Sequence, residues 1–378
     1  MNRIIQVFTR YSPPYFKGGI ETFIYNFSSY LFKKGYESEV IAMKDEFPYK
    51  DEQNNIIKLK VPKIPVFVAL LFQRKFWKYA KNGDVVTIHY PTLGVFKPKN
   101  KKAVLILHTL ASEEGQYYNR ASLKGYLRKL YRVYFAGLLE KITFRKVEHI
   151  VCLNQDIYQK LLKRKVPKEK ISLIKNGVDT EKFAFTEPRA LKEDDKVRFL
   201  YVGRLIERKN IKKMLEAFSA LNRNDFKLTI VGVGPLEQQI EELVSTRYAH
   251  LDIEFLGYKS GDDLIEEYQK CDVYILPSFY EGLPFTLLEA MSTGKPAVVG
   301  GFANAPDIIN EGKNGYIIQH NTKEDLAETI NKSMENKAEI SKKAYEARRI
   351  IVNQYSLNSS LKEIEVLFRN LGIMAYEK

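Results

Sequence analysis

Short apolar segments alternate with longer amphipathic segments along most of the chain. The short segments are rich in β-branched residues and predict strands, whereas the longer ones repeat apolar residues at helical spacing and predict helices. The first half contains five predicted strands, at 4–8, 39–43, 84–88, 103–108 and 149–153, and two predicted helices, at 20–34 and 123–146.

A second series of the same kind begins near residue 197. Its predicted strands are 197–202, 227–231, 252–255, 272–276 and 297–299, separated by predicted helices at 211–221, 236–245, 262–270 and 285–292. Alternating strands and helices indicate βαβ units and parallel sheets. Two such series predict two α/β domains, each with a doubly wound parallel sheet.

A polar, charged segment at 182–196, which contains Pro188, is the predicted boundary between the domains. We therefore expect one domain at 1–182 and a second at 183–355. The remaining residues, 356–378, are expected to form a C-terminal helix that packs back on the first domain.

Composition favours a folded protein with two domains. The chain has 378 residues, of which 45% are hydrophobic and 12% aromatic, which argues against disorder. Its two cysteines, Cys152 in a predicted strand and Cys271 at the start of the apolar run of another, are expected to be buried thiols. The first residues enter a strand without signal-peptide features, and no apolar run reaches the roughly 18–20 residues of a membrane span. We expect a cytosolic protein.

The net charge of +14 is distributed unevenly. The first 190 residues carry +18 and the rest −4, so the first half is expected to meet an anionic surface, either nucleic acid or the cytoplasmic leaflet of a membrane. Solubilising surface lysines are the alternative explanation. A nucleic-acid partner is disfavoured, because the sequence contains no recognisable nucleic-acid-binding motif.

The segment 66–79 is the main candidate for membrane contact. Arg74, Lys78 and Lys81 share one predicted helical face, and the chain's single tryptophan, Trp77, lies beside them. This composition suits a helix at the membrane interface, but it suits equally a core helix with a basic outer edge. A second basic stretch, 124–132, with neighbouring tyrosines, gives the membrane interpretation modest support.

Candidate binding residues follow the predicted strands, where open parallel sheets bind ligands. Gly18 and Gly19 precede the first helix and could offer backbone N–H groups to an anion, or could simply form a turn. Arg204 and Lys209 follow the first strand of the second series and are suited to a diphosphate. Arg208, between them, could be merely solvated.

Two glutamates, Glu281 and Glu289, lie eight positions apart in an otherwise apolar stretch. Pro284 is predicted to be the first residue of a helix, which leaves the N–H groups of Leu283, Phe285 and Thr286 free to bind an anion. Carboxylates are good acceptors for sugar hydroxyls. The occupant consistent with both features is a sugar joined through a diphosphate to a nucleoside.

The segment EGLPFTLLEAMSTGKP at 281–296 resembles the E-x7-E motif of the retaining glycosyltransferases of family 4. The resemblance covers most of the chain and includes GGIE at 18–21, NGVD at 176–179 and GRLIERK at 203–209. It implies the GT-B fold, in which two Rossmann-like domains face each other across a cleft.

The resemblance also implies roles for individual residues. Glu281 would hold the donor sugar, Glu289 the ribose, and Arg204 with Lys209 the diphosphate. Further donor contacts would come from Gly19, from Tyr258 and Lys259 beside the base, and from the helix start at Gly282, Leu283, Pro284, Phe285 and Thr286. His108 would lie near the reacting sugar, although Thr109 follows it where the family often has an acid. His89 is an acceptor-side candidate.

We therefore expect a retaining hexosyltransferase that uses a UDP- or GDP-sugar and acts on a lipid-linked or saccharide acceptor at the inner face of a membrane. No divalent metal is expected, because the sequence contains neither Asp-x-Asp nor a cluster with metal-ligand spacing. The alternatives are an enzyme with a soluble acceptor, such as a glucan or disaccharide, and a non-catalytic sensor of nucleotide sugars.

Overall fold

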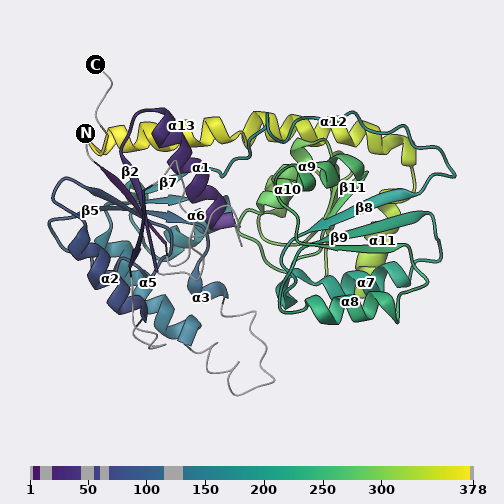
Figure 1. Cartoon of the computed structure of the whole chain (residues 1–378), viewed down its shortest axis with the longest axis horizontal. Helices are drawn as coiled ribbons and strands as arrows, with labels where there is room; N and C mark the ends of the chain where they lie inside the picture. Colours follow the sequence, from purple (N-terminus) through teal and green to yellow (C-terminus); the bar gives the residue numbers. More distant parts are fainter. Residues whose placement is uncertain (1–2, 9–18, 44–54, 60–67, 115–130, 375–378) are drawn as a thin grey trace. The chain divides into compact units, whose positions relative to one another are not determined.

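A computed structural model describes residues 3–8, 19–43, 55–59, 68–114 and 131–374. The chain forms two compact units, which Figure 1 shows. The first consists of Met1–Lys175 together with Ser360–Lys378, and the second of Asn176–Ser359. Within the described residues, no helix is both long enough and apolar enough to cross a membrane.

The first unit is built on a seven-stranded parallel sheet with the order β3-β2-β1-β4-β5-β6-β7. Its strands are β1 (Ile4–Val7), β2 (Ser38–Met43), β3 (Asn55–Leu59), β4 (Val85–Ile88), β5 (Lys102–Leu107), β6 (His149–Cys152) and β7 (Ile171–Leu173). The strand order reverses between β1 and β4, and ligands bind open parallel sheets at such a switch point.

Helices cover both faces of this sheet (Figure 1). They are α1 (Gly19–Lys33), α2 (Val68–Tyr79), α3 (Ala111–Glu114), the π-helical turn Tyr131–Ala136, α5 (Gly137–Lys146) and α6 (Gln155–Lys163). Ile24 of α1 packs with Val40 and Ala42 of β2, whereas Ile41 of the same strand belongs to the cluster that contains Phe72 of α2. Successive residues of a strand point to opposite faces, so both faces are apolar.

The segment at 66–79 is a core helix with a basic outer edge over its described residues. Phe72 and Phe76 of α2 are fully buried, and Trp77 is only 4% exposed. Lys78 is exposed on the opposite side of the helix, together with Arg74. The tryptophan therefore stabilises the core of the first unit and does not lie at its surface.

The second unit contains a six-stranded parallel sheet with the order β10-β9-β8-β11-β12-β13. Its strands are β8 (Val197–Val202), β9 (Phe226–Val231), β10 (Ile253–Gly257), β11 (Val273–Leu276), β12 (Ala297–Gly300) and β13 (Gly315–Ile318). Its helices are α7 (Ile211–Ser219), α8 (Glu237–Ser245), α9 (Gly261–Lys270), α10 (Phe285–Ser292), α11 (Lys323–Met334) and α12 (Lys337–Gln354). The predicted strands and helices of this half are confirmed within two residues at each end, and β13, α11 and α12 are additions.

The last helix, α13 (Leu357–Asn370), contributes most of its length to the first unit. Phe368 packs edge-to-face on Phe27 of α1 at 5.9 Å between ring centroids. Tyr30 of α1 also donates a hydrogen bond to Glu365 of this helix. The helix expected at 356–378 is thus present at Leu357–Asn370 and contacts α1.

The chain passes from the first unit to the second at residues 175 and 176, a few residues before the predicted boundary at 182. The reason is local backbone pairing. Val178 donates its N–H to the carbonyl of Tyr355 at 2.9 Å, and Leu357 donates to the carbonyl of Val178 at 2.9 Å. These bonds attach the segment to the end of α12, within the second unit.

Candidate active site

Two loops meet at the carboxyl ends of the neighbouring strands β8 and β11. One spans residues 203–210 and the other 277–284. The N–H of Phe279 donates to the carbonyl of Arg208 at 3.0 Å. In return, Nη1 of Arg208 donates to the carbonyl of Tyr280 at 2.8 Å. The sequence suggested that Arg208 could be merely solvated, whereas its side chain bonds the first loop to the second.

A buried ion pair between Lys209 and Glu281 strengthens this junction. The Lys209 Nζ lies 2.6 Å from Glu281 Oε1, and the two side chains are 10% and 6% exposed. Burial alone would raise the pKa of Glu281, but Lys209 and Arg208 outweigh it, so the pKa is lowered. Glu281 is therefore ionised at neutral pH, and removing one partner would leave an uncompensated buried charge.

Helix α10 begins directly after this loop. Pro284 occupies the position before its first residue, one place earlier than predicted, and its carbonyl accepts from the amides of Leu287 and Leu288. Within the described part of the chain, no backbone acceptor is bonded to the N–H groups of Phe285 and Thr286. Exposed amides at a helix start attract anions.

Glu289 lies on the second turn of α10, where Tyr268 of α9 donates a hydrogen bond to its Oε2 at 2.8 Å. Burial raises the pKa of Glu289 to about 7, although the Tyr268 hydrogen bond and the charge of Lys182 oppose the shift. The two glutamates therefore flank the helix start in different states. Glu281 is a paired carboxylate, whereas Glu289 titrates near neutral pH.

Three fully buried tyrosines form hydrogen bonds to the residues of these loops and of α10. Tyr201 donates to the carbonyl of Arg204 at 3.2 Å. Tyr274 donates to the carbonyl of Val202 at 3.2 Å and is also hydrogen-bonded to Thr286 Oγ1 at 2.8 Å. Tyr268 is the third, bonded to Glu289. Sequence reasoning missed all three because tyrosines in apolar segments indicate only a core. Their hydroxyl partners are visible only in the fold.

The remaining candidates of the second unit lie around the two loops. Arg204 is exposed, and no hydrogen bond or ion pair joins its guanidinium to another described residue. Tyr258 is 44% exposed after the edge strand β10, and Lys259 is paired with Glu267 at 3.0 Å. Asn304, which the sequence did not single out, donates to the carbonyl of Gly282 at 2.6 Å and holds the second loop in place.

Gly232 brings the loop after β9 against the loop after β8. Its φ is +144°, and a Cβ there would lie 1.9 Å from the carbonyl oxygen of Gly203. Its N–H also donates to the carbonyl of Gly257 at 2.7 Å. Glycine is therefore required at this position for the close packing of the loops.

In the first unit, His89 and His108 follow the neighbouring strands β4 and β5. The Nδ1 of His89 lies 3.2 Å from Nε2 of His108. Burial lowers the pKa of His108 to about 3, so its ring is neutral at physiological pH. Gly19 is the first residue of α1, whereas Gly18 lies outside the described residues.

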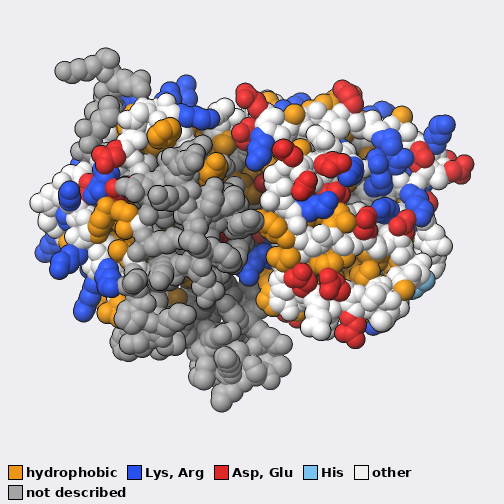
Figure 2. Space-filling view, viewed as in Figure 1, with side chains coloured by type: hydrophobic (Ala, Val, Ile, Leu, Met, Phe, Trp, Pro, Cys, Tyr) orange, Lys and Arg blue, Asp and Glu red, His pale blue; other side chains and the backbone are white. Residues whose placement is uncertain are grey.

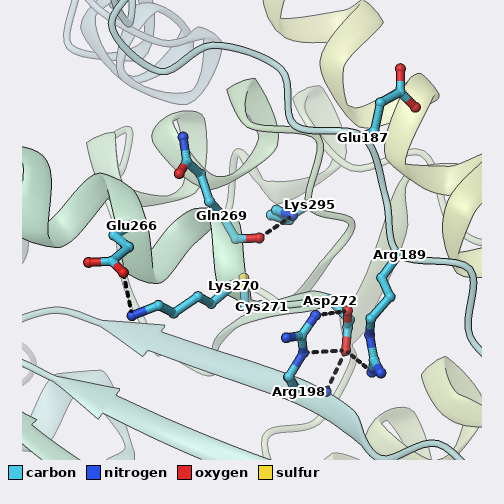
Figure 3. A pocket seen from close by; sticks show the side chains of 9 residues that line it. All are labelled: Glu187, Arg189, Arg198, Glu266, Gln269, Lys270, Cys271, Asp272 and Lys295. Carbon is cyan, nitrogen blue, oxygen red and sulfur yellow. Dashed lines mark hydrogen bonds and ion pairs between the residues drawn. The ribbon is translucent and has the colours of Figure 1, made fainter.

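A separate hollow of about 320 Å³ lies at the opposite, amino ends of β8 and β11 (Figure 3). Arg198 makes a bidentate contact with Asp272 there, and Arg189 contacts the same carboxylate at 3.1 Å. Lys295, also lining the hollow, donates to the backbone carbonyl of Gln269. The hollow is separate from the candidate active site because it lies at the other ends of these strands. Among the described residues, no group of His, Cys, Asp and Glu side chains could hold a metal ion.

Two protein-family models match adjoining parts of the chain. The model "Glycosyltransferase Family 4" matches residues 17–182, and "Glycosyl transferases group 1" matches residues 183–350. Together they extend over most of the chain, and they meet at the predicted domain boundary.

Relatives with similar sequences are also named glycosyltransferases. An uncharacterized glycosyltransferase of Methanocaldococcus jannaschii is 25% identical over 97% of this chain and 98% of its own length. The amylovoran biosynthesis glycosyltransferase AmsK of Erwinia amylovora is 24% identical over 61% of this chain and 58% of its own.

Solved structures share the fold. Sucrose-phosphate synthase from Thermosynechococcus elongatus superposes with a TM-score of 0.82 at 20% identity, covering 98% of this chain and 99% of that one. HepE of Anabaena, solved in complex with UDP-glucose, superposes with a TM-score of 0.76 at 16% identity, covering 97% and 99%.

The two parallel sheets and these matches define the chain as a glycosyltransferase with the GT-B fold. More narrowly, it is a family-4-like glycosyltransferase whose second half matches the group 1 glycosyl transferases, and its relatives include a glycosyltransferase of amylovoran biosynthesis.

The raised pKa of Glu289 predicts a pH-dependent effect on stability. Between its ordinary value of 4.5 and about 7, Glu289 keeps a proton in the folded state that the unfolded chain has lost. The free energy of unfolding should therefore fall as pH rises through this range, relative to that of Glu289→Gln, which cannot ionise. Urea unfolding of both proteins at pH 5, 6, 7 and 8 measures this difference.

Glu241→Gln on the exposed side of α8 controls for the substitution itself. A difference between wild type and Glu289→Gln that stayed constant from pH 5 to 8 would contradict the assigned protonation of Glu289.

Proposed function

We propose that this glycosyltransferase transfers a hexose from a UDP- or GDP-sugar, with retention of the anomeric configuration, to a saccharide or lipid-linked acceptor of a cell-surface glycan. The observation that carries the proposal is the pair of joined loops around the start of α10, with Glu281 on one side and Glu289 on the helix itself.

The charges around α10 suit each part of such a donor. The amides at the helix start and the exposed guanidinium of Arg204 supply positive potential for a diphosphate. The carboxylates of Glu281 and Glu289 can accept hydrogen bonds from the hydroxyls of the transferred sugar and of the ribose. HepE, which shares the fold, was solved with UDP-glucose, and this supports a nucleotide-sugar donor.

We propose further that the reaction needs no divalent metal. Charge develops on the diphosphate as the glycosidic bond breaks, and preorganised cations and amides can stabilise that charge. Arg204, Lys209 and the start of α10 provide them within the second unit. The E-x7-E spacing, which the retaining enzymes of the family share, supports retention.

The acceptor is proposed to be presented at an anionic membrane surface on the cytoplasmic side. The amylovoran enzyme among the relatives supports a glycan acceptor. The proposed contact with an anionic membrane is supported by α2, whose outer edge exposes Arg74, Lys75 and Lys78. In Figure 2, Lys and Arg side chains are prominent at the free edge of the first unit, whereas both signs are mixed on the second.

A panel of nucleotide sugars incubated with the protein in EDTA tests the donor and the metal independence together. We expect slow hydrolysis of one UDP- or GDP-hexose, and NMR of the first-formed sugar product with an added acceptor should show a retained anomeric configuration. Activity that disappears in EDTA and returns with a divalent ion would refute the metal-free mechanism. Efficient transfer to a free disaccharide or glucan would identify a soluble acceptor instead.

The two glutamates should have separable effects. Glu289→Gln should weaken binding of the free nucleoside diphosphate about tenfold, because a buried hydroxyl of the ribose loses a charged acceptor. In Glu281→Gln the two loops stay joined through the backbone contacts of Arg208 with Phe279 and Tyr280. This variant should therefore leave that binding within about threefold and lower single-turnover rates by roughly 10²-fold or more, because the contact of Glu281 is to the transferred sugar. Calorimetry and single-turnover kinetics measure the two effects. The reverse pattern would mean that the donor binds in the opposite orientation.

If the protein binds an anionic membrane, it should sediment with anionic liposomes in a salt-sensitive manner and should not sediment with neutral ones. Each basic residue near an anionic leaflet contributes about 1 kcal/mol, so the double variant Lys78→Glu/Lys81→Glu should bind at least about tenfold more weakly. The same charge change on α11, Lys323→Glu/Lys332→Glu, is the matched control. Equal loss in both variants would assign the binding to net charge and not to the edge of α2.

A further inference from the structure

A chain of buried hydrogen bonds runs from β1 to His108. The Oε1 of Gln6 lies 3.1 Å from Nε2 of His89, and Nδ1 of His89 lies 3.2 Å from Nε2 of His108. Gln6 is fully buried and His89 is 1% exposed, so solvent does not substitute for these partners. In each of these contacts, therefore, one group must donate a hydrogen atom and the other must accept it with a lone pair.

The orientation of the Gln6 side chain is fixed by α1. Its Nε2 faces the backbone carbonyl oxygen of Ile24 at 3.4 Å and also donates to the hydroxyl of Ser28. A backbone carbonyl can only accept a hydrogen bond. Turning the amide over would place two acceptor oxygens against each other, so Oε1 must be the atom that faces His89.

The protonation of both histidines follows from that orientation. His89 Nε2 must carry hydrogen in order to donate to Gln6, which leaves Nδ1 of the neutral ring as an acceptor. His108 Nε2 must then carry hydrogen in order to donate to that nitrogen. Burial lowers the pKa of both rings, and the neighbouring His108 lowers that of His89 further, so a doubly protonated ring is disfavoured.

The surrounding side chains hold the two rings in place. Phe23 of α1 contacts both, with ring centroids 5.7 Å from His89 and 5.1 Å from His108. After His108, the start of α3 is held by Glu140, which accepts from the N–H of Ala111 at 2.6 Å and from the hydroxyl of Ser112 at 2.8 Å. The backbone on either side of His108 is therefore anchored to the first unit.

We infer that Gln6 and His89 are positioning residues that fix His108 in the tautomer with hydrogen on Nε2 and a lone pair on Nδ1. His108 can then only accept a further hydrogen bond, which makes it selective for a ligand group that donates one. A hydroxyl of the sugar meets that requirement, whereas a phosphate or carboxylate oxygen does not. This last step rests on the proposed function, whereas the tautomer itself does not.

Nitrogen-15 NMR of histidine-labelled protein tests the tautomer directly. The chain has five histidines, so the two-bond ¹H–¹⁵N spectrum is simple enough to assign by single substitutions. At pH 7 we expect both His89 and His108 to show a protonated Nε2 and a bare Nδ1. A protonated Nδ1 on His108, or an imidazolium on either ring, would overturn the inference and leave the proposed function untouched.

Gln6→Met tests the positioning role, because methionine has a similar shape but offers His89 no comparable acceptor. The Nδ1 signal of His108 should move toward the average of the two tautomers, and kcat/KM should fall about two- to tenfold, the effect of one weakened hydrogen bond. Binding of the free nucleoside diphosphate should be unchanged. Gln73→Met is the matched control, since Gln73 is equally buried but bonds to the backbone of Thr92 and Phe96.

The outcomes separate the two claims. An unmoved His108 signal in Gln6→Met, or an equal shift in Gln73→Met, would overturn the role of Gln6. A shifted signal with unchanged kcat/KM would retain the tautomer relay and overturn the contact between His108 and the sugar.

Discussion

The second unit depends on the buried ion pair between Lys209 and Glu281. Each charge would be costly to bury alone, so the loop after β8 and the loop after β11 are stable only when they are held against each other. The backbone bonds of Arg208 to Phe279 and Tyr280 reinforce the same contact. As a result, these contacts fix the start of α10 against the cations of the neighbouring loop.

Hydrogen bonds from buried tyrosines connect the candidate site to the core of the second unit. Tyr201, Tyr268 and Tyr274 are completely buried, yet each forms a hydrogen bond with a backbone or side-chain oxygen of the site. Burial of an unsatisfied hydroxyl is unfavourable, so the packing of these rings and the position of the site elements are coupled. The first unit uses a comparable arrangement, in which Gln6 and His89 connect the core of the sheet to His108.

The strand pattern and the E-x7-E stretch could be predicted from the sequence because each has a local cause. A short apolar run determines where β8 forms and the spacing of apolar residues where α10 forms. Glu281 and Glu289 stand out as charges in an apolar stretch. The roles of Arg208, Asn304 and the tyrosines could not be predicted, because their partners lie far away along the chain. For the same reason the segment around Trp77 remained ambiguous, since its pattern suits a membrane and a protein core equally. The strand β7 was missed because it has only three residues, and β3 and β13 were missed because their apolar runs are only two and three residues long.

The first unit is discontinuous in the sequence, and this affects the order in which the protein can fold during synthesis. Its sheet and α1 are made first, but Leu361, Ile364 and Phe368 of α13, all buried, are made last. The second unit, from Asn176 to Ser359, is continuous and has its entire core before α13 leaves the ribosome. The order of completion is therefore the reverse of the order along the chain. Until α13 has been synthesised, Phe27 of α1 cannot pack on Phe368. The nascent first unit then exposes an apolar surface of the kind that chaperones bind.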